Sequence, residues 1–220
     1  MSWRFIACTA LFITCLLMAN VTASKLIAAG SLTLTAGIVI FPVSYIVGDV
    51  LTEVWGYAAA RRVIWLGFAC NLLMVAAIWA GGALPPASFW RGQAAYEEIL
   101  GQAPRILVAS FVAYLLGEFA NAYVLARLKI ATAGRWLWVR TIGSTVVGEG
   151  LDSLVFVALA FAGTVSSGVL VEIFVNQWLV KVLYEAAATP LTYAAVGWLK
   201  SRERIDTFDV KTDFNPLKLS

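Results

Sequence analysis

The sequence predicts an all-α membrane protein with six transmembrane helices and with both termini in the cytoplasm. Three observations predict this fold class. First, 61% of the 220 residues are hydrophobic and only 13% are charged, whereas soluble domains average about 45–50% apolar and about 25% charged residues. Second, the apolar residues fall into six runs, each close to the ~20 residues that a bilayer requires. Third, lysine and arginine concentrate in alternate connections between these runs.

The six runs are expected to form one transmembrane domain, residues 1–199. Each is predicted to be helical, because a long apolar segment in lipid satisfies its backbone only within a helix. Pro42 removes a backbone donor from the second run, so we expect a kink or a break there. A short interfacial helix is predicted at 94–100, and residues 200–220 form a polar cytoplasmic tail expected to be only partly ordered. The predicted spans are 4–24, 35–57, 62–81, 104–127, 139–164 and 171–198.

The orientation follows from the positive charges. With the N-terminus in the cytoplasm, the cytoplasmic segments hold twelve Lys and Arg residues, the outer segments hold three, and Lys181 lies within the sixth span. This asymmetry predicts that both termini are cytoplasmic, and Arg61 and Arg62 are interpreted as an anchor at that surface. The outer residues are Lys25, Arg91 and Arg105; the cytoplasmic ones are Arg4, Arg61, Arg62, Arg127, Lys129, Arg135, Arg140, Lys200, Arg202, Arg204, Lys211 and Lys218.

Polar residues within the spans fall on shared helical faces. Residues four apart lie on the same side of a helix, as do Asp49 and Glu53 in the second span and Gln177, Lys181 and Glu185 in the sixth. We therefore predict a polar cavity between the second, fourth, fifth and sixth spans. Its candidate substrate-binding residues are Asn20, Tyr45, Asp49, Glu53, Glu118, Asn121, Arg140, Glu149, Asp152, Gln177 and Lys181.

Acidic residues outnumber basic ones in these spans. Lys181, joined by Arg140 at the cytoplasmic mouth, faces six acids, and each charge left at the bilayer centre costs at least ~2.5–3.5 kcal/mol on insertion scales. We expect an acid within ion-pair range of Lys181, with Glu185 as the local candidate and Asp152 or Glu149 as the functional one. Any single polar residue could be purely structural, but the excess favours a cavity that handles a solute. The acids are Asp49, Glu53, Glu118, Glu149, Asp152 and Glu185.

The predicted lining favours a flat solute that is rich in N–H groups. Carboxylates accept pairs of N–H donors, amides both donate and accept, and aromatic rings stack on flat heterocycles. Anions are disfavoured, because they would require clustered arginines or several helix N-termini.

The composition also argues against an enzyme and against a metal or cofactor site. The chain has no histidine, and its cysteines, Cys8, Cys15 and Cys70, lie within apolar runs, which is not a metal-ligand pattern. It has neither a serine-nucleophile elbow nor a Walker-type phosphate loop, so any ATP hydrolysis would come from another chain. The expected partners are a small molecule and the lipid bilayer, not nucleic acid, and a homodimer stays open.

Several stretches of the chain stand in a characteristic order. They are residues 20–25, FPVSYIVGDVLTEVWGYAAARRVIWLGF, ASFWRGQAAYEEILGQAPRI, ASFVAYLLGEFANAYVLARLK and WVRTIGSTVVGEGLDSLVF. Together they resemble the YhhQ-type queuosine precursor transporter family, formerly called vitamin uptake transporters (VUT). The resemblance covers about residues 15–200 and leaves the polar tail outside.

This resemblance implies an inner-membrane, multi-pass importer of 7-deazaguanines. The solutes would be 7-cyano-7-deazaguanine and 7-aminomethyl-7-deazaguanine, precursors of the tRNA nucleoside queuosine. A guanine-like edge presents a ring N–H beside an exocyclic amine, and one carboxylate, from Asp49 or Glu53, can accept both. The cationic 7-aminomethyl form also suits an acidic cavity. The alternative is a substrate-binding membrane subunit of an energy-coupling-factor-type ATP-driven importer, which six short spans fit equally well.

Overall fold

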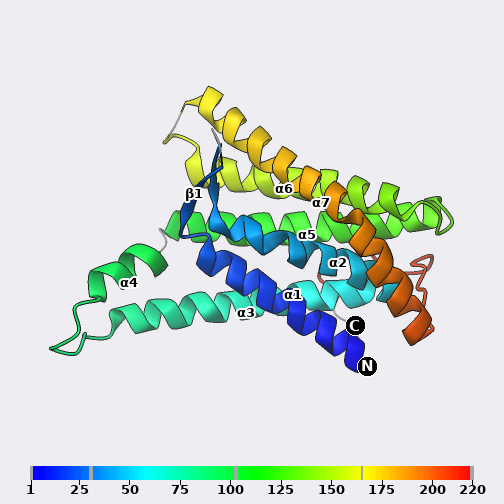
Figure 1. Ribbon diagram of the computed structural model, residues 1–220, viewed down its shortest axis with the longest axis horizontal. Coiled ribbons are helices and arrows are strands. Elements are labelled where there is room, and N and C mark those ends of the chain that lie inside the picture. The colour runs from blue at the N-terminus through cyan, green and yellow to red at the C-terminus, as the bar shows by residue number, and fades with distance from the viewer. Residues whose placement is uncertain (1, 30–31, 102–103, 165, 219–220) are drawn as a thin grey trace.

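The computed structural model describes residues 2–29, 32–101, 104–164 and 166–218. Helices account for most of this chain, and two short strands form a hairpin (Figure 1). In chain order the elements are α1 (Trp3–Thr22), β1 (Leu26–Ala29), β2 (Leu32–Thr35), the 3₁₀ helix η1 (Ala36–Val39), α2 (Phe41–Trp55), α3 (Tyr57–Ala83), α4 (Gln93–Leu100), α5 (Pro104–Ala131), α6 (Leu137–Phe161) and α7 (Ser167–Glu203).

The long helices run beside one another along a common direction. Both termini lie at one end of the bundle, the terminal end, whereas α4 and the hairpin lie at the other, the α4 end (Figure 1). Within the described residues, α1, α3, α5, α6 and α7 are long and apolar enough to cross a membrane. The predicted helical membrane architecture is confirmed, and α4 forms where the short interfacial helix was predicted.

The second predicted span, 35–57, is wrong in its first part. Thr35 pairs with Leu26 in the antiparallel hairpin, η1 follows, and α2 begins only at Phe41. Pro42 does not kink a helix: it stands in the first turn of α2, where its missing N–H is not needed. Gly56 ends α2 with a φ of +83°, a conformation that glycine adopts without a steric penalty.

Helix α2 lies inside the bundle. It packs against α1, α3, α5 and α7, and ten of its residues are buried. Its 15 residues span about 22 Å, less than the ~30 Å hydrocarbon core of a bilayer. This central helix can carry several polar side chains because its neighbours cover them.

Helices α5 and α6 lie in close contact at two glycines. A Cβ atom built on Gly117 would lie 2.7 Å from Cβ of Asp152, and one built on Gly148 would lie 2.6 Å from Cβ of Asn121. A larger side chain at either glycine would push the two helices apart. Small residues at helix crossings in membranes generally allow such a close approach. The contact brings the polar residues of both helices to the same depth.

Helix α7 is the longest element, with 37 residues, and it contains Pro190. Its axis bends part-way along its length (Figure 1). Proline cannot donate to the carbonyl one turn earlier, and it bends helices for that reason. The last part of α7 thereby crosses the terminal end, where Lys200 reaches Glu53 of α2 at 2.6 Å.

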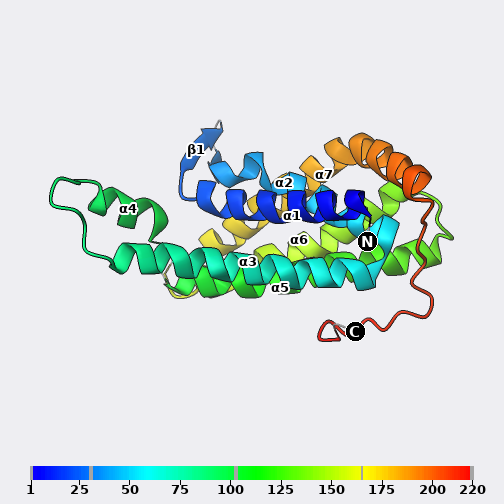
Figure 2. The same cartoon turned by 90° about the horizontal axis from the view of Figure 1, so that it is seen from below.

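The tail after α7 makes specific contacts with the start of α3. It turns back along the terminal end of the bundle (Figure 2). The guanidinium of Arg61 donates to the carbonyls of Asp213 and Asn215 at 2.9 and 2.7 Å, and the Tyr57 hydroxyl donates to the Phe214 carbonyl at 3.0 Å. Arg61 is therefore a buried docking group for the tail and not only a surface anchor.

Candidate functional site

A buried group of polar side chains, the polar cluster, lies where α2, α5, α6 and α7 meet. On α7, Lys181 forms ion pairs with Glu149 and Asp152 of α6, each at 2.6 Å. Its ammonium also lies 4.8 Å from the ring centre of Phe41. Lys181 is thus paired across two helices, and not with Glu185 on its own helix.

The α2 and α5 side of the cluster is built around Asp49. The amide of Asn121 donates to Oδ1 of Asp49 at 2.7 Å. Tyr45 stands one turn before Asp49, and Glu118 one turn before Asn121. All four side chains are buried, with Asp49 only 1% exposed. Four helices therefore deliver their polar groups to one place deep in the bundle.

Several oxygen atoms of the cluster have no hydrogen-bond partner among the described residues. Burying such a group without a partner costs about 1–3 kcal/mol, and native proteins hold few of them. Four of them are carboxylate or amide oxygens, which accept, and three are hydroxyl oxygens, so the cluster offers more acceptors than its own donors use. The seven atoms are Tyr45 Oη, Asp49 Oδ2, Asn121 Oδ1, Thr145 Oγ1, Glu149 Oε1, Ser153 Oγ and Glu185 Oε1.

Glu53 belongs to a different network, one turn closer to the terminal end. Arg140 donates to it twice, from Nη2 to Oε1 at 2.8 Å and from Nε to Oε2 at 3.1 Å. Lys200 pairs with Oε1 at 2.6 Å, and Lys129 lies 3.5 Å from the same atom. Asp206 of the tail pairs with both lysines. Three cations surround Glu53, so the structure does not bring Glu53 and Arg140 into the polar cluster.

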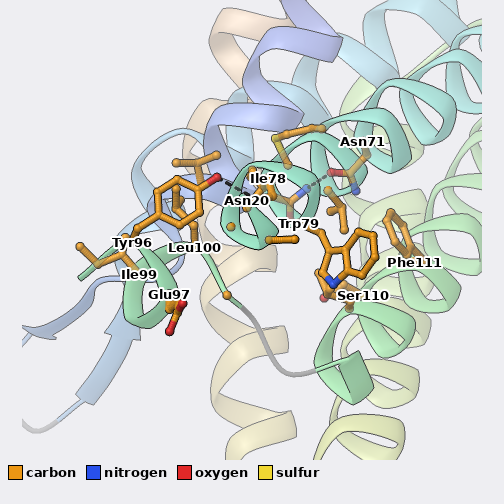
Figure 3. A pocket seen from close by; sticks show the side chains of 17 residues that line it. Asn20, Asn71, Ile78, Trp79, Tyr96, Glu97, Ile99, Leu100, Ser110 and Phe111 are labelled. Atoms are coloured by element: carbon orange, nitrogen blue, oxygen red, sulfur yellow. Dashed lines mark hydrogen bonds between the residues drawn. The ribbon is translucent and has the colours of Figure 1, made fainter. Parts of the chain in front are cut away.

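Two further predicted site residues lie away from the centre of the cluster. Gln177 is half-buried, one turn before Lys181 on α7. Asn20 lies toward the α4 end, where its amide donates to Asn71 of α3 at 3.1 Å. Both asparagines line a separate pocket with Trp79 and Phe111 (Figure 3).

The sequence analysis did not single out Ser153, Asn71 or Lys129 as site residues. Ser153 follows Glu149 by four residues, so helical spacing could have placed it on the cluster face. Asn71 is the one amide side chain in a long apolar run, which is itself a signal. Lys129 gave no such signal, because its partner Asp206 lies 77 residues away.

Comparison with known proteins identifies the family. Residues 35–195 match the family described as "Putative vitamin uptake transporter". The chain belongs to this family. The matched range contains the whole polar cluster, so the vitamin uptake transporter match covers both the fold and the cluster that the fold assembles.

Two relatives of this chain carry names that state a solute. A Bacillus subtilis (strain 168) protein named "Probable queuosine precursor transporter" is 33% identical over 187 residues, which are 84% of this chain and 82% of the relative. An Escherichia coli (strain K12) protein named "Queuosine precursor transporter" is 32% identical over 127 residues, 58% of this chain and 55% of the relative. No solved structure matches the chain. Like its family, the protein is a multi-pass membrane transporter and not an enzyme.

Proposed function

We propose that this protein imports queuosine precursors, 7-cyano-7-deazaguanine, 7-aminomethyl-7-deazaguanine or both, across the inner membrane and binds them in the polar cluster. The two named relatives support the class of solute. The observation that carries the proposal is the set of buried oxygens that have no partner among the described residues. A flat heterocycle with several N–H groups would use these acceptors.

Asp49 is the favoured hydrogen-bond acceptor for the guanine-like edge of the solute. One of its oxygens accepts from Asn121, while Asp49 Oδ2 and Asn121 Oδ1 have no partner among the described residues. Two neighbouring acceptors match a ring N–H that stands beside an exocyclic amine. The ring of Tyr45, tilted against Phe41 at 4.8 Å between centroids, adds an aromatic surface on the same helix.

The charge of the cluster suits the aminomethyl form. Within it, Lys181 is the one base among the described residues, whereas Asp49, Glu118, Glu149 and Asp152 are acids. A primary ammonium on the solute would supply the positive charge that the cluster lacks. The cyano form would instead rely on its N–H donors.

The Glu53 network closes the path from the polar cluster to the cytoplasm and does not bind the solute. In the proposed orientation both termini are cytoplasmic, so Glu53, Arg140, Lys200 and Asp206 lie between the cluster and the cytoplasm. Release of the solute then requires this network to loosen. Its tail member, Asp206, is partly exposed and is the accessible point at which loosening can begin.

Uptake by cells tests the function. Cells that lack precursor transport would express this chain, an equal amount of its Asp49→Asn variant, or neither, and would receive radiolabelled 7-cyano-7-deazaguanine. We expect accumulation only with the unaltered chain. Equal accumulation in all three cultures would contradict the proposal. Purified chain in liposomes then separates the two modes of transport: movement of solute without another protein excludes the energy-coupling-factor alternative.

A further inference from the structure

A separate pocket, the α4-side pocket, opens at the α4 end of the bundle. Its volume is about 320 Å³, and α1, α3, α4 and α5 form its walls (Figure 3). The hydrogen-bonded pair of Asn20 and Asn71 lines it together with the rings of Trp79 and Phe111 and the carboxylate of Glu97. A pocket of this size, mostly apolar with a few polar groups, is typical of small-molecule sites.

Three side chains close this pocket toward the polar cluster. Phe12, Leu16 and Tyr114, the hydrophobic plug, converge on Gly67 of α3. A Cβ atom built on Gly67 would lie 2.7 Å from the Tyr114 hydroxyl and 3.2 Å from atoms of both Leu16 and Phe12. The Tyr114 hydroxyl donates to the carbonyl of Ile64 at 3.1 Å, which fixes the ring in place. Only a residue without a side chain fits at the centre of this plug.

The polar cluster begins directly beyond the plug. A small cavity there has room for about one water molecule. Along α5, Phe111 lines the pocket, Tyr114 belongs to the plug, and Glu118 lines the small cavity, at successive helical turns. Pocket, plug and cluster therefore follow one another along one face of α5. The small cavity is lined in part by Phe12, Gly48, Ile64, Glu118 and Asn121.

We propose that the α4-side pocket is a second binding site for the same flat, N–H-rich heterocycle, occupied before the solute passes the plug and reaches the cluster. This inference rests on the proposed function and adds a receiving site to it. The amides of Asn20 and Asn71 bind the solute edge, and Trp79 and Phe111 contact its faces.

The polar groups favour a solute over a lipid chain as the occupant. Asn71 is buried, with 4% of its surface exposed, and its amide has two N–H groups. Its described hydrogen bond uses only its oxygen, as acceptor from Asn20. A hydrocarbon chain gains nothing from an amide pair or from Glu97, and it would remove them from water at a loss. A heterocycle satisfies them and also fills the aromatic wall.

Equilibrium binding to the purified full chain tests this inference. The probe is tritiated 7-cyano-7-deazaguanine, measured by dialysis over a wide concentration range. We expect two classes of site in the unaltered protein. Asn71→Leu should weaken one class about tenfold or more, and Asp49→Asn should weaken the other. Leu73→Ala, on the exposed face of the same helix, is the matched control and should leave both classes intact.

A second variant guards against a folding defect. Trp79 is 77% exposed, so Trp79→Ala removes the aromatic wall without opening the core, and it should weaken the same class of site as Asn71→Leu. A single class that requires Asp49 but is unchanged in the Asn71 and Trp79 variants would overturn the second site while sparing the proposed function. Absence of any binding to the unaltered chain would overturn both. A lipid that co-purifies with the unaltered chain, and that the probe does not displace, would also overturn the second site.

Discussion

The guanidinium of Arg140 donates two hydrogen bonds to the carboxylate of Glu53, at 2.8 and 3.1 Å. Glu53 stands only four residues after Asp49 on the same helix, yet Asp49 faces the polar cluster and pairs with Asn121. One turn of α2 thus separates a carboxylate that contacts three cations from a carboxylate with a buried oxygen that has no partner among the described residues. This difference gives the two residues different predicted roles.

Replacing Glu53 should damage stability and not recognition. Glu53→Gln leaves Arg140, Lys200 and Lys129 without their shared counter-charge, and breaking a buried ion pair costs about 3–5 kcal/mol. We expect a lower melting temperature in detergent, with the affinity for 7-cyano-7-deazaguanine unchanged per folded molecule. Thermal unfolding and solute binding, measured on the same preparation of the Glu53→Gln variant, separate a loss of stability from a loss of affinity. A loss of affinity at unchanged stability would place Glu53 in contact with the solute.

Replacing Asp49 should lower the affinity for the solute and not the stability of the fold. Asp49→Asn keeps the size of the side chain but sets an N–H against the N–H groups of the solute. Losing a charge-assisted pair and leaving donors unmatched costs about 2–4 kcal/mol, or roughly thirty- to several-hundred-fold in affinity. Binding to purified protein measures this loss, and Glu53→Gln is the neighbouring control. Wild-type affinity in the Asp49 variant would transfer recognition to Glu118, Glu149 or Asp152.

The pairing of Lys181 should be visible in a double-mutant cycle. Lys181→Met leaves Glu149 and Asp152 uncompensated, and we expect a loss of about 3–5 kcal/mol in stability. Adding Asp152→Asn removes one of the uncompensated charges, so the double variant should recover part of this loss, with a coupling of about 0.5–3 kcal/mol. The measurement is the unfolding of all four proteins. Strictly additive effects would mean that the two residues do not interact in the membrane.

The contact between Asp206 and the two lysines should depend on pH. Burial opposes ionisation of this carboxyl, but hydrogen bonds and charge from Lys129 and Lys200 hold its pKa below the usual range. A depressed pKa stabilises the fold above about pH 4, the ordinary value of an unfolded aspartate, and the stabilisation fades as the pH falls through the folded value. Asp206→Asn should therefore melt at a lower temperature at pH 7, and the difference should shrink toward pH 3. Glu98→Gln, on an exposed position of α4, should melt like the unaltered chain throughout; a difference for Asp206→Asn that persists at pH 3 would refute the ion-pair explanation.

The orientation prediction can be checked with reporter fusions. The twelve-to-three distribution of Lys and Arg predicts that a fusion after the last residue reports from the cytoplasm and that one within 85–100 reports from outside. If a C-terminal fusion is labelled from outside intact cells, the direction of transport proposed above must be reversed.

Features that depend on composition and helical spacing could be predicted. The apolar runs predicted the helices, and four-residue spacing placed Asp49 and Lys181 on inward faces. The hairpin was missed although Leu32–Thr35 alternates leucine and threonine, which is the pattern of a strand, because the segment lies mostly in the short connection between two predicted spans. Pro42 was recognised as a breaker, but sequence spacing did not show that it begins a helix.

Features that depend on distant partners could not be predicted. Glu53 and Lys200 are 147 residues apart, and Arg61 meets the Asp213 carbonyl from 152 residues away. The pattern of Arg61 and Arg62 is the same for a surface anchor as for a buried docking group. Only the folded chain shows that Arg61 is 2% exposed and that three cations surround Glu53.

The involvement of Lys200 and Asp206 in the Glu53 network bears on how the protein is made. Glu53 and Arg140 leave the ribosome long before Lys200 and Asp206, which lie within the last tenth of the chain. Until translation ends, the network lacks one of its cations and its second acid, and the buried charges of a half-made protein remain incompletely neutralised. A newly inserted chain can therefore complete this end of its fold only after release from the ribosome. A nascent chain cut short before residue 200 would lack Lys200 and Asp206, so Glu53 and Arg140 would stay in an incomplete network at the terminal end of the bundle.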